Sequence, residues 1–273
     1  MRIVTLIENT VGSKPLKCEH GLSIYVETGK HKLLVDTGSS GAAIDNAKAL
    51  GVDIKNVDTV ILSHGHYDHT GGVMRFVQEN PKAKIYMQKK GGKDYYSSSG
   101  GTIHYIGVDK AILDLPNMNL IEGDLRIDEE LSLFTGVTGR KYWPSGNRTL
   151  ILRENGVDKQ DIFDHEHYLV IKSEGKSLLL SGCAHNGILN ILEKYREIYG
   201  GEPDVVISGF HMMKKTGYLK EDEEIIKGTA MELKKLKTIF YTGHCTSLAG
   251  FEIMKEIMKD QLNYIETGSE FIL

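Results

Sequence analysis

A dense run of metal-binding residue types constrains this chain more than any other sequence feature. The segment Ser63–His69, with the sequence SHGHYDH, holds three imidazoles and one carboxylate within six consecutive residues. It directly follows the apolar stretch Val57–Leu62. Imidazole nitrogen and carboxylate oxygen are the ligand atoms favoured by zinc, iron and manganese. Four such groups are more than one ion needs from one loop, so the run predicts a two-metal site and hydrolytic or group-transfer chemistry.

The composition limits the classes of protein to which the chain can belong. It has 273 residues, of which 40% are hydrophobic and 26% are charged, and a formal net charge of −4, as is ordinary for a soluble globular protein. No block of lysine or arginine indicates a nucleic-acid surface, and no apolar stretch approaches the ~20 residues that span a bilayer. The sequence therefore predicts a small-molecule substrate rather than a nucleic acid or a membrane, and it leaves the oligomeric state open.

The cysteines and the N-terminus indicate the compartment. Cys18, Cys183 and Cys245 are a sparse, odd-numbered set that cannot build a disulfide framework, which favours a reducing environment. The strand-like run Met1–Asn9 is too short for the core of a signal peptide and is followed by no small-residue cleavage site. We therefore expect a cytoplasmic protein.

Hydrophobic periodicity predicts strands and helices in alternation, interrupted by hairpins. Strands are expected at Arg2–Glu8, Leu22–Thr28, Lys32–Asp36, Asn56–Ser63, Lys84–Gln88, His167–Ser173, Lys176–Ser181, Asp204–Ser208, Thr238–Thr242 and Gln261–Glu266, with two more within 120–135. Helices are expected at Ser40–Leu50, Val73–Gln78, Ile188–Tyr199, Glu221–Lys235 and Ala249–Lys259. Because hairpins interrupt the alternation, a layered α/β sandwich with mixed sheets fits better than a doubly wound parallel sheet. No linker divides the chain, so residues 1–273 are predicted to form a single domain.

Two segments that contain aromatic residues are predicted to be loops. Gly91–Gly101 is rich in glycine and serine and is expected to be flexible, and Arg140–Asn147 is expected to lie at the surface. Their aromatic side chains are Tyr95, Tyr96, Tyr142 and Trp143. Two interpretations stay open, since such loops can cap a site or can simply pack their aromatic rings against the protein.

Three further histidines follow predicted strands in the second half of the chain. His185, His211 and His244 each come after an apolar strand and a glycine, in the segments SGCAH, SGFH and TGH. In α/β folds, sites gather at the carboxyl ends of strands, where loops from distant parts of the sequence meet. Repetition of this pattern is hard to explain by core packing, so we interpret these histidines as candidate site residues.

Together these motifs resemble the metallo-β-lactamase-fold superfamily. The resemblance is carried by an Asp-Thr-Gly segment, the HxHxDH run and two strand-end histidines, namely Asp36, His64, His66, Asp68, His69, His185 and His244. It implies an α/β fold of the four-layer αββα sandwich type with mixed sheets. The segments around the later histidines resemble one subgroup. That subgroup includes the synthase that joins a dihydropterin to a ribofuranosyl-aminobenzene phosphate in methanopterin synthesis, and bacterial relatives described only as metal-dependent hydrolases.

The resemblance also implies how the ligands divide between two metals. The first metal would be held by His64, His66 and His185. The second would be held by Asp68, His69 and His244. Asp36 would accept a hydrogen bond that orients a ligand imidazole or its loop, although Asp-Thr-Gly after a strand also makes a good Asx turn. Zinc is the metal we favour, with iron and manganese as alternatives, since all three accept these ligands.

One position departs from the pattern of the superfamily. Cys183 stands where many members have an aspartate that bridges both metals. The bridge would then be water or hydroxide alone, with weaker binding of the second metal. Cys183 could itself be a ligand, but we favour the interpretation that it is a small buried hydrophobe.

The remaining histidines have weaker roles in this scheme. His211 has no metal assigned and would lie beside the site, where it could bind a phosphate or donate a proton, or simply be a hydrogen-bonded strand-end residue. His165 and His167 have a spacing that can bind metal, but we do not favour them as ligands. No ligand-like context surrounds His20, His31 and His104.

The function predicted from the sequence is that of a dinuclear metal-dependent hydrolase. It would act on a small, phosphorylated or pterin-like substrate by attack of a metal-bound hydroxide, with Asp68 binding metal and holding the hydroxide in line. The first alternative is a transferase of the dihydropterin-ribofuranosyl-aminobenzene-phosphate synthase type, in which the metals bind a pyrophosphate leaving group. The second alternative is a binding or sensor protein that keeps the metal site.

Overall fold

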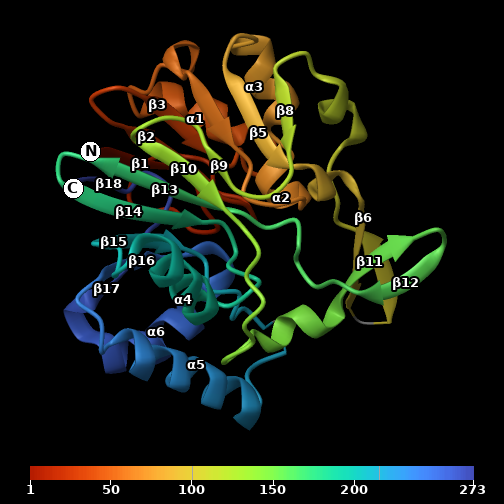
Figure 1. Ribbon diagram of the computed structural model, residues 1–273, viewed down its shortest axis with the longest axis vertical. Coiled ribbons are helices and arrows are strands. Elements are labelled where there is room, and N and C mark those ends of the chain that lie inside the picture. The colour runs from red at the N-terminus through yellow and green to blue at the C-terminus, as the bar shows by residue number, and fades with distance from the viewer. Residues whose placement is uncertain (100, 215) are drawn as a thin grey trace.

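The computed structural model describes residues 1–99, 101–214 and 216–273. Across these residues, two seven-stranded mixed sheets pack face to face with helices on their outer faces (Figure 1). In order across the first sheet, the strands are β18 (Glu270–Ile272), β1 (Arg2–Ile7), β2 (Ser23–Glu27), β3 (Lys32–Val35), β4 (Thr59–Ile61), β5 (Lys84–Gln88) and β8 (Met118–Ile121). Those of the second are β17 (Leu262–Tyr264), β16 (Ile239–Thr242), β15 (Val205–Ser208), β14 (Lys176–Ser181), β13 (Tyr168–Ser173), β10 (Leu131–Phe134) and β9 (Leu125–Arg126). The predicted αββα sandwich is therefore confirmed.

The helices divide between the two outer faces. The first sheet carries α1 (Ala42–Ala49) and α3 (Val73–Glu79), and the second carries α4 (Ile188–Tyr199), α5 (Lys220–Leu233) and α6 (Ser247–Met258). The short helix α2 (Tyr67–Thr70) lies instead in the segment that follows β4. Phe76 of α3 packs in one outer core, and Ile191 of α4 and Met254 of α6 pack in the other. Within the described part of the chain, none of the helices has both the length and the apolar character to cross a membrane.

A third core lies between the two sheets and holds the sandwich together. Ile24 and Val35 of the first sheet meet Leu178 and Ile207 of the second, and all four side chains are at most 3% exposed. The alternation of strand residues between this inner core and the outer cores explains why the strands read as nearly continuous apolar runs. Burial of both faces is the main source of stability here.

The amphipathic pattern of α4 shows how local sequence fixes an element. Its residues Ile188, Ile191, Leu192 and Tyr195 recur at helical spacing and are all buried. The helix ends at Gly200, whose φ of 70° is left-handed and whose N–H donates to the carbonyl of Arg196. The observed bounds match the prediction for this helix.

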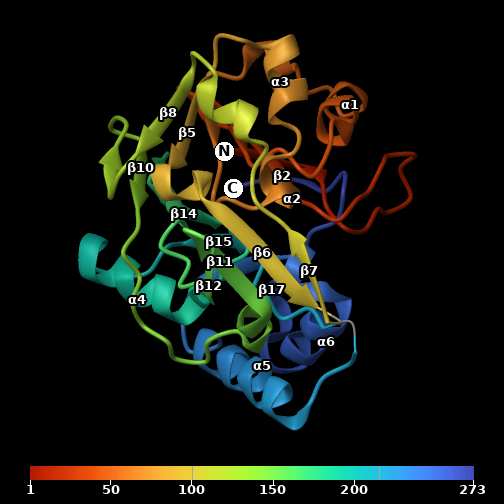
Figure 2. The same ribbon diagram turned by 90° about the vertical axis from the view of Figure 1, so that its right-hand side faces the viewer.

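The prediction of a flexible loop at Gly91–Gly101 is wrong. Residues Asp94–Ser99 form β6, which lies inside a third sheet with the order β12 (Val157–Gln160), β11 (Leu150–Glu154), β6 and β7 (Thr102–Tyr105). This sheet projects from the side of the sandwich in Figure 1 and faces the viewer in Figure 2. The partner strand β11 is about 50 residues away in the sequence, so no local pattern reveals the pairing. Gly100 lies outside the described residues.

Both sheets contain a parallel segment that positions the candidate site. In the first sheet β3, β4, β5 and β8 run parallel, and in the second β14, β15, β16 and β17 do so. The segment Ser63–His69 follows β4, and the three later histidines follow β14, β15 and β16. The carboxyl ends of parallel strands lie along one edge of a sheet, so loops from both halves of the chain meet there.

Candidate metal centre

Three buried imidazoles meet at the edge of the sandwich. The ring centroids of His64 and His66 lie 4.6 Å apart, and that of His185 lies 5.0 and 4.9 Å from them. All three residues are at most 4% exposed. Their Nε2 atoms are buried and have no hydrogen-bond partner among the described residues. Buried polar atoms are rarely left unpaired, so these three nitrogens, the first donor group, fit a metal ion.

Hydrogen bonds on the far side of the rings hold them in a metal-binding form. The amide of Asn147 donates from Nδ2 to the carbonyl of His185 (2.7 Å), so its Oδ1 faces the ring nitrogen Nδ1 of His185 at 2.9 Å. His185 therefore carries its proton on Nδ1, and Nε2 keeps a free lone pair. Ser63 Oγ similarly contacts Nδ1 of His64 at 2.8 Å.

Burial and crowding keep the first donor group uncharged. Burial, followed by the neighbouring imidazoles, lowers the pKa of His64 and His185 well below the usual value. The same causes, with His165 as the foremost neighbour, lower the pKa of His66 to about 3. Neutral imidazole is the form that binds metal, so near neutral pH the group is ready to receive a cation.

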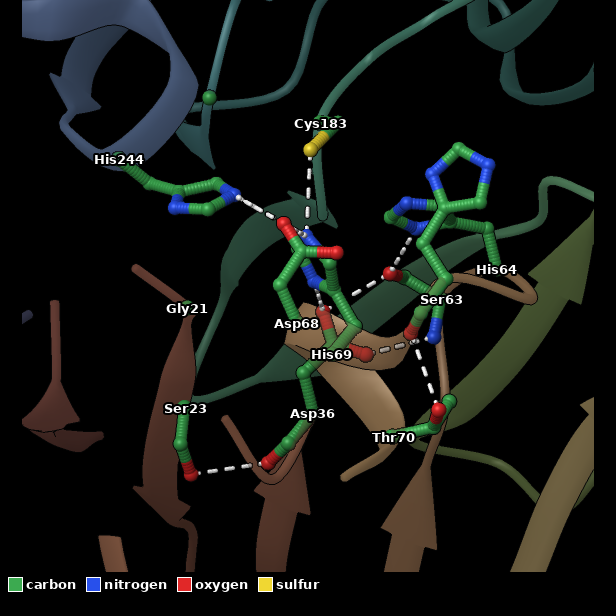
Figure 3. Close-up of polar contacts among 12 residues, drawn as sticks. Gly21, Ser23, Asp36, Ser63, His64, Asp68, His69, Thr70, Cys183 and His244 are labelled. Carbon is green, nitrogen blue, oxygen red and sulfur yellow. Dashed lines mark hydrogen bonds and ion pairs between the residues drawn. The ribbon is translucent and has the colours of Figure 1, made fainter. Parts of the chain in front are cut away.

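A second donor group lies directly beside the first. It consists of Asp68, His69, Cys183 and His244, and one donor atom from each falls within 4.8 Å of the others. The Nε2 atom of His69 is 3.2 Å from Nε2 of His244 and 3.1 Å from Sγ of Cys183. Figure 3 shows these side chains facing one another. The Oδ2 atom of Asp68 is 3.3 Å from Nε2 of His244 and 3.7 Å from Nε2 of His69. Carboxylate, imidazole and thiol in such proximity are a chemically suitable set for zinc or iron.

Asp36 orders both the histidine loop and His69 (Figure 3). It is fully buried, and its Oδ1 accepts a hydrogen bond from the backbone N–H of Ser63 at 2.7 Å. Its Oδ2 accepts from the Ser63 hydroxyl at 2.8 Å and contacts Nδ1 of His69 at 2.6 Å. A carboxylate only accepts, so Nδ1 of His69 must carry a proton. The carboxylate is thus used for orienting this imidazole rather than for an Asx turn.

The charges of the second donor group are coupled. Burial lowers the pKa of His69, but Asp36 and Asp68 outweigh it and raise the pKa to about 9. Burial alone would raise the pKa of Asp68, but His69, His20 and His244 together hold it well below its usual value. Both shifts favour positive charge beside the Asp68 carboxylate, and a divalent metal would supply that charge in place of a proton.

Cys183 occupies a place between the two groups. Besides its contact with His69, its sulfur belongs to a cluster with the donor atoms of His64 and His185. The side chain is 3% exposed, which fits a small buried hydrophobe, but its polar neighbours are those of a ligand. The sulfur therefore lies between the two donor groups, within reach of His69 on one side and of His64 and His185 on the other.

His211 lies against the first donor group without completing it. Its ring centroid is 4.1 Å from that of His185, and its Nδ1 atom is buried without a hydrogen-bond partner in the described residues. Its backbone N–H donates to Sγ of Cys245 at 3.2 Å. The φ of 50° at His211 is left-handed, which turns the chain sharply after β15.

Sequence reasoning missed two histidines at the site. His20 Nε2 lies 3.3 Å from Oδ2 of Asp68, and the side chain is 45% exposed, so it borders the open side of the site. His165 Nδ1 accepts a hydrogen bond from the N–H of Gly65 at 3.0 Å, and its Nε2 contacts Asp161 at 3.1 Å. His20 stands alone in a loop and has no sequence signal, whereas the spacing of His165 and His167 is a signal that the sequence analysis did not favour.

The remaining histidines, His31, His104 and His167, belong to neither donor group. His167 is buried, and its ring nitrogens have no partner among the described residues. His31 contacts Asp58 and Asp128, and His104 is exposed on β7. Both segments predicted as loops reach the site. Arg140–Asn147 does so through Asn147, and Gly91–Gly101 does so through Tyr95, whose ring centroid lies 4.1 Å from that of His165.

Comparisons with known proteins identify the family. The metallo-beta-lactamase superfamily model matches residues 16–148. The chain is 30% identical to the 7,8-dihydropterin-6-methyl-4-(beta-D-ribofuranosyl)-aminobenzene-5'-phosphate synthase of Methanocaldococcus jannaschii, over 98% of this chain and 95% of that protein. The chain belongs to the metallo-beta-lactamase superfamily. It is also 27% identical to an uncharacterized protein of the same organism, over 97% and 96% of the two chains.

Solved structures agree with this assignment of family and fold. A metal-dependent hydrolase of the beta-lactamase superfamily has a TM-score of 0.83 and 27% identity, with 100% of this chain and 99% of that chain covered. Zn(2+)-bound PqqB from Methylobacterium extorquens shares the fold at a TM-score of 0.61 and 15% identity, with both chains fully covered. Both structures therefore share their fold with this chain over its whole length.

Proposed function

We propose that the chain is a dinuclear metal-dependent hydrolase that acts on a small-molecule substrate. The observation that carries the proposal is the first donor group, whose three buried Nε2 atoms have no partner among the described residues. The second donor group beside it supplies a carboxylate, two imidazoles and a thiol. The likeness to a solved metal-dependent hydrolase, 27% identical over the whole chain, supports the same conclusion.

In this proposal each donor group holds one divalent cation, with zinc favoured over iron or manganese. The ligands are His64, His66 and His185 for the first, on the strength of their ring contacts. Those for the second are Asp68, His69 and His244. When bound, two cations supply Lewis acidity and lower the pKa of water towards neutrality. We add Cys183 as a ligand between the groups, in place of the buried hydrophobe that the sequence favours, because its sulfur contacts His69 at 3.1 Å.

The chain's own side chains would perform the remaining steps. Asp36 and Asn147 orient His69 and His185, so that each ring presents Nε2 to the site. Asp68 would both bind metal and hold an attacking water in line. His211 would bind a phosphate oxygen or donate a proton at Nδ1, since this buried atom has no partner in the described residues. We expect the activity in the cytoplasm, because the thiols of Cys183 and Cys245 are free.

A transferase is the second candidate, and one specific observation favours it. The chain is 30% identical to a relative whose name describes a synthase of a dihydropterin compound, and the match covers 95% of that relative. The same two donor groups could bind a pyrophosphate leaving group instead of activating water. The scaffold alone does not decide between the two reactions, since one fold hosts many chemistries.

Turnover assays on zinc-loaded protein separate the candidates. A hydrolase should release p-nitrophenol from bis-p-nitrophenyl phosphate or p-nitrophenyl acetate, and Asp68→Asn should lower the rate at least 100-fold. The control Asp114→Asn removes an exposed carboxylate at the end of a 3-10 turn and should leave the rate unchanged.

The outcome for the transferase is distinct. Release of pyrophosphate from a dihydropterin diphosphate, only in the presence of the ribofuranosyl-aminobenzene phosphate acceptor, would replace the hydrolase by the synthase. If folded, metal-loaded protein turns over none of these substrates, both the hydrolase and the transferase are contradicted. The interpretation as a binding or sensor protein would then be left.

A further inference from the structure

A large pocket adjoins the first donor group on the side of Phe163. It has a volume of about 860 Å³ and is lined by the residues that follow β5, β8 and β10, together with Ile162–Asp164. This volume lies within the ~300–1,000 Å³ that small-molecule sites occupy. The ring of Phe163 stacks on the imidazole of His185, with the centroids 4.4 Å apart and the planes within 3°. One aromatic ring therefore separates the pocket from a candidate metal ligand.

The charged residues of the pocket are mostly cationic. Lys89, Lys90, Lys93 and Arg140 line it, against the carboxylates of Glu122 and Asp164. Each lysine is already paired, since Lys89 lies 2.8 Å from Glu122, Lys90 lies 2.6 Å from Asp164, and Lys93 lies 2.5 Å from Glu154. Arg140 differs from them, because no carboxylate of the described residues lies within ion-pair distance of its guanidinium.

The hydrogen bonds of Arg140 fix its guanidinium and leave donors free. Nη1 donates to the carbonyl of Gly139 at 2.7 Å and to Oδ1 of Asn186 at 3.2 Å, and Nη2 donates to the carbonyl of Ile162 at 3.3 Å. These contacts use three of the five N–H groups, so Nε–H and one N–H of Nη2 have no acceptor in the described residues. A guanidinium held in place with two free donors is suited to bidentate binding of an oxyanion.

The pocket also contains an acceptor without a donor. Oδ2 of Asp164 pairs with Lys90, but its Oδ1 atom is buried and has no partner in the part of the chain that the structure describes. The apolar walls come from residues such as Val137, Leu120 and Phe163. A ligand that fits has an anionic end and an apolar body, and an N–H or O–H donor would add a hydrogen bond to Asp164.

We propose that Arg140 anchors the anionic group, a carboxylate or a phosphate, of a small organic substrate in this pocket. The proposal rests on the proposed function, because the substrate's reacting end would lie past Phe163 at the two donor groups. Asn186, which follows His185 directly, connects the guanidinium to the site. Arg140 is then a specificity-determining residue, which selects anionic over neutral substrates by binding rather than by chemistry.

The single tryptophan of the chain gives a readout that does not depend on turnover. The guanidinium of Arg140 lies 5.5 Å from the centre of the Trp143 ring, so an anion bound to it changes the surroundings of the only indole. Metal-loaded protein is titrated with phenyl phosphate, with phenylacetate and with the neutral phenylacetamide, and Trp143 fluorescence is followed. We expect saturable binding of at least one anion, and at least tenfold weaker binding of the neutral amide.

Four variants distinguish the pocket from the metal centre. Arg140→Ala should weaken binding of the anion at least tenfold, Arg140→Lys should recover part of it, and Arg75→Ala, which removes a guanidinium on α3, should leave it unchanged. Asp68→Ala, which disables the second donor group, should also leave it unchanged. Loss of binding in Asp68→Ala with retention in Arg140→Ala would overturn the proposal, because the anion would then bind at the metals.

The two proposals can fail separately. If anion binding depends on Arg140 but the protein hydrolyses none of the substrates, the proposed anion-binding pocket is supported and the proposed hydrolase activity is refuted. Hydrolysis with equal KM for an anionic and a neutral ester, unaffected by Arg140→Ala, would refute the pocket and sustain the hydrolase. Tighter binding of phenyl phosphate would identify the anionic group as a phosphate, and tighter binding of phenylacetate would identify it as a carboxylate.

Discussion

Replacement of Asp36 by asparagine tests the ordering of the second donor group with minimal change of shape. The carboxylate accepts from Ser63 N–H, from the Ser63 hydroxyl and from Nδ1 of His69. An amide has one acceptor oxygen, so in Asp36→Asn its NH2 group must face a donor on one side. If it faces His69, Nδ1 must become the acceptor, and the ring proton moves to Nε2, the atom offered to the metal.

The size of the effect follows from the bond that is lost. A hydrogen bond to a charged group contributes about 1.5–3 kcal/mol. At ~1.4 kcal/mol for each factor of ten, this corresponds to roughly 10- to 150-fold in the dissociation constant of the second metal. The figure agrees with the ~10–100-fold loss seen when partners of ligand imidazoles are removed.

Equilibrium dialysis against chelator-buffered zinc, followed by elemental analysis, measures this affinity directly. Asp36→Asn should bind the first zinc nearly as wild type does and the second at least tenfold more weakly, with circular dichroism confirming the fold. Asp114→Asn, in an exposed 3-10 turn, is the matched control and should behave as wild type. Two zinc ions bound with wild-type affinity by folded Asp36→Asn would refute the reasoning from tautomers.

Two further predictions concern stability and the histidine loop. Burial lowers the pKa of His31, but hydrogen bonds to Asp58 and Asp128 outweigh it and raise the pKa above 6.5. The stabilisation from His31 is therefore complete below pH 6.5 and is lost as the pH rises through the folded-state pKa. In urea unfolding, His31→Asn should lose more free energy of unfolding, relative to wild type, at pH 5.5 than at pH 9. An equal loss at both pH values would contradict this prediction. In Gly65→Ala the new Cβ would lie 2.2 Å from the carbonyl oxygen of Gly91. We therefore expect the protein to be destabilised by ~1–3 kcal/mol and to bind the first zinc more weakly. An unchanged melting temperature and zinc affinity would refute the close approach.

The parts of the site that depend on local sequence could be predicted. Each later histidine follows an apolar strand and a glycine, and strand ends of one sheet edge are neighbours in space whatever their distance in sequence. This is why His185, His211 and His244 could be expected to gather at one place. The assignment of His185 and His244 beside the HxHxDH run, about 120 and 175 residues away, came from the resemblance to the superfamily. The helix Ile188–Tyr199 was equally accessible, because its periodicity and its terminal glycine are local signals.

The rest depends on contacts that no local pattern encodes. Strand β6 is stabilised by pairing with β11, and its composition of serine and glycine neighbours favours a loop when it is considered alone. His20 and His165 reach the site through loops, and a histidine in a loop has no periodicity to show where it points. The contact of Cys183 with His69 is likewise visible only in three dimensions.

The central claim, a dinuclear metal centre, is tested most directly by the metal content of the purified protein. Protein isolated anaerobically and dialysed against trace zinc, iron and manganese should retain two transition-metal ions per chain by elemental analysis. The double variant His185→Ala/His244→Ala, which removes one ligand from each donor group, should retain fewer than one ion per chain. A wild-type chain that is folded and holds less than one ion under these conditions would contradict the account.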